Sequence, residues 1–160
     1  MIIEFGKYKG MSVELLIFRD PGYANWICNQ PGRVGKLAEA KAHARKLARL
    51  FDRKPFVAEC SGRNCKNIAT RFSVFKDAHL NPVWWCNDCD PYSLCAGPGR
   101  LAVLSRFVRA IDHVEMYGGG KRATFKSLIR EFGTAKGLPR RVGEKQAQEF
   151  FKSDEEWGPP

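Results

Sequence analysis

The sequence predicts an α+β fold in which small β-hairpins, at residues 1–10 and 66–86, pack with four or five amphipathic helices. Three observations support this class. Short segments alternate apolar and polar residues beside turn-forming residues, as strands do. Longer segments repeat apolar residues at helical spacing. Two cysteine pairs in the middle of the chain each adjoin a predicted strand, which is typical of a zinc-ribbon-like hairpin.

The N-terminal segment predicts a hairpin followed by helices. Ile2–Phe5 and Lys7–Lys9 alternate in polarity, with glycines at the expected turns, and Met11–Phe18 follows as a short helix. Asp20 and Pro21 then have the residue types of an N-cap and a first helical position. An apolar stripe at helical spacing follows them, formed by Tyr23, Trp26 and Ile27.

Two motifs in this segment carry a family resemblance. Phe5-Gly6-Lys7-Tyr8-Lys9-Gly10 and Asp20-Pro21-x-Tyr23-x-x-Trp26-Ile27 resemble the small C-terminal accessory module of exodeoxyribonuclease X-like proteins, which related phage and bacterial chains share. The resemblance covers about the first thirty residues and includes no counterpart of the exonuclease core. It therefore implies a DNA-processing context but no activity. The aromatic residues are also explained as a small core, with Lys7 and Lys9 either solvated or close to a ligand.

A basic helix is predicted over residues 36–51, which are rich in strong helix formers. Lys41, Arg45 and Arg49 recur every four residues on one face. Like charges at this spacing repel one another, and a polyanion would relieve the repulsion. An ordinary solvated face is the alternative. His43 is expected to be exposed and without a partner.

The cysteine pairs predict a four-thiolate metal site. The predicted ligands are Cys60, Cys65, Cys86 and Cys89. A tight turn lets two thiolates of each pair reach the same ion, and Zn²⁺ prefers four such sulfurs in a tetrahedron. A closed site of this kind has no position for water, so we expect it to be structural and not catalytic.

Several alternatives to this site stay open. Cys95 or His79 could replace one of the four ligands. A disulfide or an iron–sulfur cluster would use the same thiols, although the hairpin spacing suits zinc better. Trp84 and Trp85, in the strand before the second pair, point to opposite faces. One is expected to pack in the core, while the other could stack a base or pack against a helix.

The C-terminal part predicts helices over Arg100–Met116, Arg122–Phe132 and Glu144–Lys152, with Gly118–Gly120 as a hinge and with Gly133, Gly137 and Pro139 as chain breaks. A second row of cations follows the middle helix, formed by Arg122, Lys126 and Arg130. Residues 153–160 form an acidic tail.

The charge pattern points to an anionic partner. The net charge is +10, and residues 31–56 carry eight basic and two acidic side chains, while residues 100–145 carry eleven and four. Such basic segments attract nucleic-acid phosphates without regard to sequence. The predicted contacts are Lys7, Lys9, Lys41, Arg45, Arg49, Arg122, Lys126 and Arg130.

Catalytic signatures are missing from the sequence. There is no phosphate-binding loop, no dinucleotide fingerprint and no His-Glu-x-x-His motif, and the carboxylates suggest no two-metal site. We therefore expect a non-catalytic, zinc-containing nucleic-acid-binding accessory protein, with DNA favoured over RNA. The alternative is an adaptor or inhibitor that docks an acidic partner protein, and a nuclease subunit is a more distant one.

The predicted organisation has five parts: a hairpin–helix module (1–32), a basic helix (33–55), the zinc-ribbon-like module (56–99), a helical region (100–152) and the acidic tail (153–160). No apolar run approaches the roughly 18 residues of a membrane span, and the N-terminal residues lack a signal-peptide pattern. These features, with free cysteines suited to metal binding, predict a cytoplasmic protein.

Overall fold

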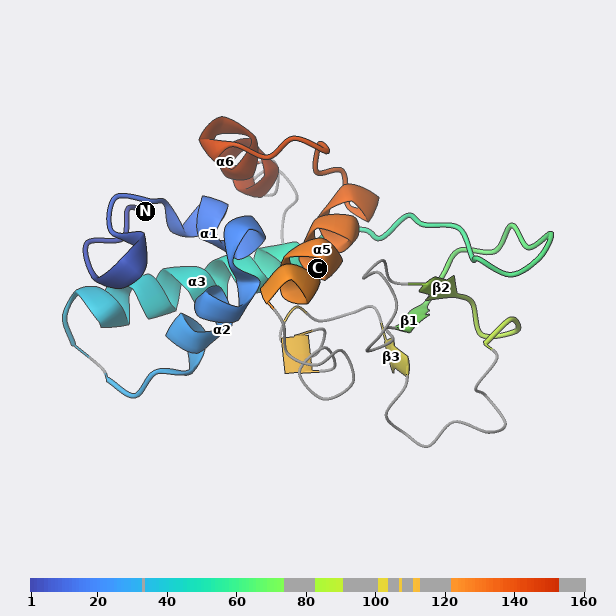
Figure 1. The fold of residues 1–160 in the computed structure, drawn as a ribbon, viewed down its shortest axis with the longest axis horizontal. Coiled ribbons are helices and arrows are strands. Elements are labelled where there is room, and N and C mark those ends of the chain that lie inside the picture. Colours follow the sequence, from blue (N-terminus) through green and yellow to red (C-terminus); the bar gives the residue numbers. More distant parts are fainter. Residues whose placement is uncertain are drawn as a thin grey trace.

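A computed structural model shows a helical body at one end, a small sheet with the cysteine loops at the other end, and helix α5 between them (Figure 1). It describes residues 1–32, 34–73, 83–90, 101–103, 107, 111–112 and 122–152. The helices are η1 (Gly6–Tyr8), α1 (Val13–Arg19), α2 (Pro21–Asn29), α3 (Lys36–Arg53), α5 (Arg122–Ala135) and α6 (Glu144–Lys152). The strands are β1 (Arg71–Ser73), β2 (Val83–Trp85) and β3 (Leu101–Val103). The α+β class is thus confirmed.

The predicted pairing of the N-terminal hairpin is wrong. Ile2 bridges to Ser12, and the Ile3 N–H donates to the Met11 carbonyl at 2.8 Å. The residues expected to form the second strand instead make the 3₁₀ turn of η1. Gly6 permits this turn because its φ is +61°, a conformation that costs other residues energy. Alternating polarity alone does not fix which segment a strand pairs with.

Helices α1 and α2 begin as their capping residues dictate. The Ser12 hydroxyl accepts a hydrogen bond from the Leu15 N–H, and the Asp20 carboxylate accepts one from the Tyr23 N–H at 3.2 Å. Pro21 occupies the first turn of α2. The predicted N-cap at Asp20 is confirmed, and it fixes the sharp change of direction between the two helices.

The helical body has an aromatic core. The ring of Phe18, on α1, lies 5.4–6.3 Å from those of Phe51 on α3 and of Phe150 and Phe151 on α6. Helix α3 matches its predicted span and extends to Arg53, and α6 has its predicted bounds. Burial of these large aromatic side chains contributes strongly to stability at this end.

Helix α5 runs through the predicted break at Gly133 and ends at Ala135. A Cβ at Gly133 would lie 2.7 Å from Leu138 Cδ2, so close packing and not a turn requires glycine there. After this end the chain turns at Gly137, whose φ is +93°, and the Leu138 N–H donates to the Gly133 carbonyl at 2.7 Å.

The sheet has the order β2-β1-β3, and both pairs are antiparallel. The predicted helix over Arg100–Met116 is wrong at its start, because Leu101–Val103 form the strand β3 on the free edge of β1. Phe107, Ile111 and Asp112 are helical as predicted. An apolar Leu-Ala-Val sequence is compatible with a helix or a strand, and pairing with the open edge of β1 favours the strand.

A second aromatic cluster connects the sheet to α5. We call Phe56, Phe72, Trp84 and Phe132 the aromatic joint. Trp84, on β2, lies 5.1 Å from Phe132 on α5 and 5.2 Å from Phe56, centroid to centroid. Phe72, on β1, is 5.1 Å from Phe132. The packing role expected for one of the two tryptophans therefore belongs to Trp84.

Within the described ranges, no helix combines the length and the apolar composition that a membrane crossing needs. The predicted hinge at 118–120 and the predicted acidic tail at 153–160 lie outside the described residues.

Candidate metal centre and basic surface

The four predicted cysteines form one cluster that could hold a metal ion. The sulfurs of Cys60, Cys65, Cys86 and Cys89 all lie within 4.8 Å of one another. Cys65 Sγ and Cys86 Sγ are 3.8 Å apart. Four sulfurs placed 2.3 Å from a central zinc ion in a tetrahedron are about 3.8 Å apart. Cys95 and His79, the alternative ligands, lie outside the described residues.

The first cysteine loop closes a short antiparallel ladder. The Cys60 N–H donates to the Asn67 carbonyl at 2.9 Å, and the Ala69 N–H donates to the Ala58 carbonyl at 2.8 Å. Asn64 adopts a positive φ of +59° at the tip, as asparagine does more readily than most residues. The four-residue spacer between the cysteines therefore forms the compact turn that the site needs.

Gly62 has a direct role at the cluster. A Cβ at this position would lie 2.7 Å from Cys89 Sγ and 3.3 Å from Cys60 Sγ. No larger residue fits beside the sulfurs without moving them. The close approach also lets the Gly62 N–H donate to Cys60 Sγ at 3.3 Å.

The second cysteine loop is held by side chains from the first ladder and β1. Asn67 Nδ2 donates to Asp88 Oδ2 at 3.3 Å, and Thr70 Oγ1 donates to Asn87 Oδ1 at 2.9 Å. Arg71 Nη1 lies 2.5 Å from Oδ2 of Asp90, whose carboxylate is buried. These contacts fix the loop in place beside Cys60.

The thiols differ in acidity. Burial disfavours the Cys86 thiolate, but the backbone N–H groups of Cys89 and Asp88 and the Asn67 amide outweigh it and lower the Cys86 pKa to about 6. The pKa of Cys89 rises to about 12, since its thiol hydrogen-bonds to Cys65 and Cys86. A bound cation would displace the remaining protons from such a cluster.

The predicted cations of α3 lie against the end of α2. Lys41 Nζ donates to the Gln30 carbonyl at 2.6 Å, and Arg45 Nε donates to the Cys28 carbonyl at 3.0 Å. They satisfy carbonyl groups at a helix C-terminus, where cations are favourable. Arg49 is exposed and makes no ion pair or hydrogen bond to any described residue. Part of this row thus has a structural use that helical spacing alone did not indicate.

Two cations from distant segments meet at Asp20. Arg122 Nε lies 3.0 Å from Asp20 Oδ2 and Lys7 Nζ lies 3.6 Å from the same oxygen. The Tyr8 hydroxyl donates to that carboxylate at 2.5 Å and accepts from Arg122 Nη2 at 2.7 Å. Both cations remain more than half exposed, so the cluster still presents positive charge to solvent. Lys9 is exposed beside it.

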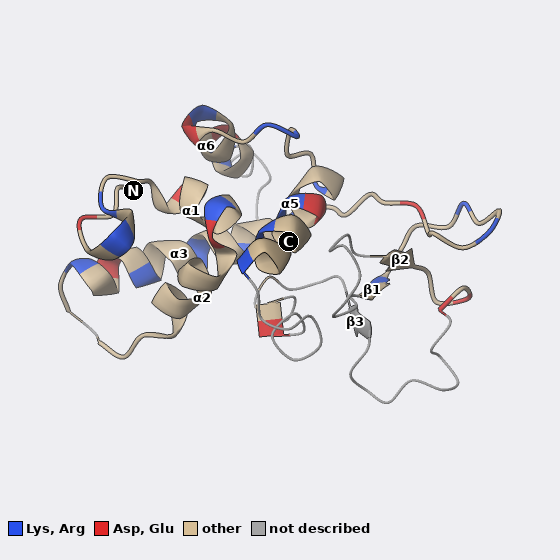
Figure 2. Ribbon diagram, viewed as in Figure 1, with Lys and Arg blue, Asp and Glu red and all other residues tan. Residues whose placement is uncertain are grey.

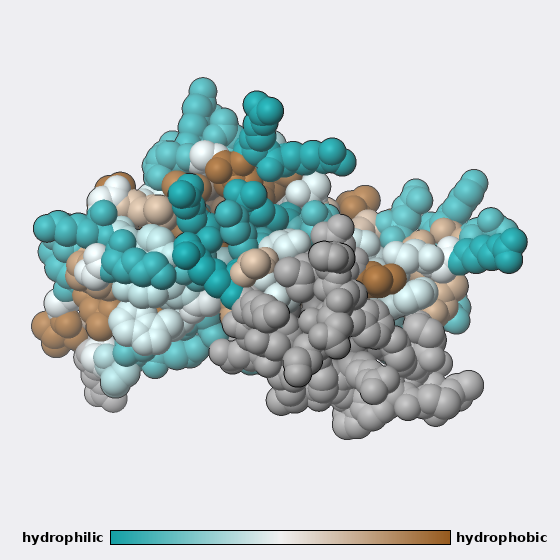
Figure 3. All heavy atoms as spheres, viewed as in Figure 1, coloured by the Kyte–Doolittle hydropathy of each residue, from teal (hydrophilic) through white to brown (hydrophobic). Residues whose placement is uncertain are grey.

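One face of α5 concentrates positive charge. Arg122, Lys126 and Arg130 belong to α5, Arg19 comes from the end of α1, and Arg140 follows α5 in the chain. We call these five residues the α5 basic face. Lys126, Arg130 and Arg140 line a surface hollow of about 570 Å³, together with Glu131. Figure 2 shows basic residues along α5 and at the adjoining end of α1, and Figure 3 shows hydrophilic side chains gathered over α5 and α6 on this side.

The electrostatics of this face are unfavourable without an anion. Burial and then the charges of Arg130, Arg19 and Arg122 lower the pKa of Lys126. Arg130 Nε is buried and has no hydrogen-bond partner among the described residues. An anion in the hollow would offset the repulsion among these cations.

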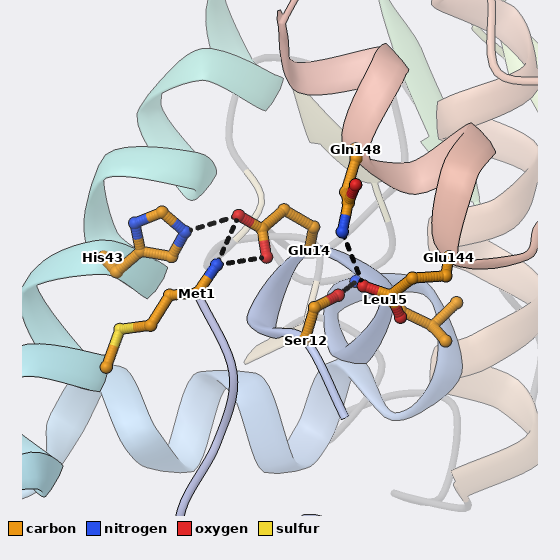
Figure 4. A network of polar contacts seen from close by, with 7 residues as sticks. All are labelled: Met1, Ser12, Glu14, Leu15, His43, Glu144 and Gln148. Carbon is orange, nitrogen blue, oxygen red and sulfur yellow. Dashed lines mark hydrogen bonds and ion pairs between the residues drawn. The ribbon is translucent and has the colours of Figure 1, made fainter. Parts of the chain in front are cut away.

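His43 is paired, contrary to the expectation from sequence. His43 Nε2 lies 2.7 Å from Glu14 Oε1, and the Met1 amino group lies 3.0 Å from both carboxylate oxygens (Figure 4). The contact joins α1 to α3 across a long stretch of chain, so helical periodicity could not reveal it. Burial favours the neutral carboxyl, but the His43, backbone and N-terminal hydrogen bonds lower the Glu14 pKa to about 2.

Glu14→Gln should make stability less dependent on pH. The folded-state pKa of about 2 lies below the ordinary value of 4.5, so the carboxylate stabilises the fold above about pH 4.5 and loses this effect as pH falls toward 2. With allowance for solvent screening, we expect a loss of about 1 kcal/mol at pH 7.

Urea denaturation of Glu14→Gln and of the native chain at each pH from 3 to 7 measures this difference. The two chains are compared at the same pH because acid also releases metal from thiolates, which affects both equally. The exposed Glu39→Gln is the matched control. A Glu14→Gln deficit that stays constant down to pH 3 would contradict the assignment.

Comparisons with family models, curated proteins and solved structures give no match for this chain. The functional proposal therefore depends on the cysteine cluster and the α5 basic face.

Proposed function

We propose that the protein is a zinc-containing, non-catalytic accessory protein that binds nucleic acid, DNA in preference to RNA, through the α5 basic face. The carrying observation is the surface hollow along α5 that Lys126, Arg130 and Arg140 line. Burial and then the charges of Arg130, Arg19 and Arg122 lower the pKa of Lys126 there. Phosphate groups are the anions that such a row of cations fits best, because their charges also repeat along a strand.

The zinc site has a structural role in this proposal. Four thiolates complete the tetrahedral coordination of a zinc ion, which leaves no coordination position for a substrate or an activated water. Thiolate ligands suit Zn²⁺ and iron–sulfur clusters, and the sulfur separation of 3.8 Å fits a single tetrahedral ion. Such a site belongs in a reducing compartment, so the proposal includes a cytoplasmic location.

The preference for DNA comes from the N-terminal resemblance. The motif residues of that segment include Lys7, Tyr8 and Asp20, and Arg122 of the α5 basic face contacts the last two. The proposed phosphate-binding surface is therefore continuous with the segment that resembles a DNA-processing accessory module.

A salt titration tests the proposal. We expect the double variant Lys126→Gln/Arg130→Gln to bind DNA at least about 10-fold more weakly at 100 mM salt and to reduce the slope of log affinity against log salt by roughly 2. Lys66→Gln/Lys145→Gln removes the same charge at exposed positions that do not line the hollow, and should have a smaller effect.

Two results would reject the proposal. One is the absence of DNA and RNA binding by the zinc-loaded native chain at 50 mM salt. The other is an equal loss in the two double variants, because the effect would then reflect net charge alone. Recovery of a single acidic protein after nuclease treatment, without nucleic-acid binding, would assign the basic face to a protein partner.

A further inference from the structure

Trp26 lies outside the core although it belongs to the apolar stripe of α2. Ala24, Ile27 and Cys28 of this helix are buried, whereas Trp26 is 44% exposed. Its ring stacks on Tyr23, with centroids 5.0 Å apart and planes inclined by 30°. Tyr23 in turn meets Tyr8 edge to face at 4.9 Å. We call Tyr8, Tyr23 and Trp26 the aromatic column.

Cations surround the inner end of the aromatic column. Lys7 Nζ lies 4.9 Å from the Tyr8 ring centroid, and the Arg122 guanidinium carbon lies 5.9 Å from it. The two share one carboxylate, that of Asp20, so positive charge remains in excess. Arg122 also belongs to the α5 basic face, so the column adjoins the proposed phosphate-binding surface.

We infer that Trp26 is a stacking platform for an unpaired base, which makes single-stranded nucleic acid the preferred ligand. This rests on the proposed nucleic-acid binding and adds a preference to it. A flat ring supported from behind by another ring, beside cations that contact phosphate, is the combination that single-strand binders use. Bases in a duplex are already stacked on each other, so an exposed indole gains little from them.

The rest of the column has features that suit this role. Tyr23 holds the Trp26 ring in one orientation, so little side-chain entropy is lost on stacking. Gly6 allows the close approach of Tyr23, because a Cβ there would lie 2.7 Å from the Tyr23 hydroxyl oxygen. The strand tryptophans are less suited, since Trp84 packs in the aromatic joint and Trp85 Nε1 donates to Ser73 Oγ at 3.0 Å.

The test uses three fluorescent probes of equal length with the zinc-loaded full chain: oligothymidylate, the same backbone with abasic sites, and a duplex. We expect Trp26→Ala to weaken oligothymidylate binding roughly 5- to 150-fold and to leave the abasic and duplex affinities within about 2-fold. Trp26→Phe, which keeps a ring, should recover most of the loss. Val34→Ala, at an exposed apolar position, is the control and should change nothing.

The three probes distinguish base stacking by Trp26 from the nucleic-acid binding on which it depends. Salt-sensitive binding of all three probes that Trp26→Ala leaves unchanged would overturn the stacking role and keep the nucleic-acid proposal. An equal loss on all probes, with or without a lowered melting temperature, would make Trp26 a supporting residue and also overturn it. Failure of the native chain to bind any probe would reject the proposal itself.

Discussion

Removal of the metal should unfold the cysteine-bearing segment and leave the helical body largely helical. Residues 57–73 and 83–90 bury few large apolar side chains, and their strands are three residues long. The helical body instead buries Phe18, Phe51 and Ile27 almost completely. Structural zinc contributes about 10–16 kcal/mol of apparent binding free energy in zinc-finger peptides, far more than this segment gains from burial.

The expected effect is large in any measurement of stability. We expect chelation, or Cys86→Ser, to cost several kcal/mol and to lower the melting temperature by on the order of 10 °C or more. Cys28→Ala is the matched control, because Cys28 is buried in α2 away from the cluster. Its effect should be confined to a small packing loss.

Metal analysis and spectroscopy complete this test. The native chain should bind one zinc ion per molecule, and replacement by cobalt should give the absorption bands of a tetrahedral thiolate site. Cys86→Ser should lose the ion, and Cys28→Ala should keep it. A metal-free chain that retains the native hydrogen-exchange protection of residues 57–73 and 83–90 would contradict a structural role for the metal.

The cysteine cluster could be predicted because its signal is local. Each pair is close in sequence, and the turn residues between Cys60 and Cys65 already restrict the backbone. The Asp20 cap is local for the same reason. Gly62, which the cluster needs as glycine, could have been singled out by its place inside the first pair.

The contacts that the sequence could not reveal join distant segments. The partner of His43 lies on α1, and the carbonyl partners of Lys41 and Arg45 lie at the end of α2. Helical spacing places these side chains on a face but says nothing of what packs against it. The same limit explains β3, since only the presence of β1 beside it favours a strand.

Trp84→Ala, in the aromatic joint, should also cause a large loss in the free energy of unfolding. Trp84 contacts Phe56, Phe72 and Phe132, and thus connects β2 to β1 and to α5. Truncation of a fully buried Trp costs about 3–5 kcal/mol; because Trp84 is half-buried, we expect about 2–3 kcal/mol. Chemical denaturation of the zinc-loaded protein measures this loss.

Trp85→Ala is the matched control, since Trp85 follows directly on the same strand and makes its hydrogen bond to Ser73. We expect it to cost less than half as much as Trp84→Ala. Equal losses in the two variants would show that the joint has no special part in stability.

The joint also predicts that metal retention and the α5 basic face are coupled. The Ser61 N–H donates to the Trp84 carbonyl at 2.8 Å, next to Cys60, while the Trp84 ring packs on Phe132 of α5. Trp84→Ala should therefore weaken zinc retention against a competing chelator and also reduce DNA affinity, whereas Lys126→Gln should reduce DNA affinity alone. Trp84→Ala leaves every cation of the α5 basic face in the chain, so a loss of DNA affinity would come from their displacement. If Trp84→Ala bound DNA as tightly as the native chain, α5 would hold its cations in place without the metal module, and the coupling would be contradicted.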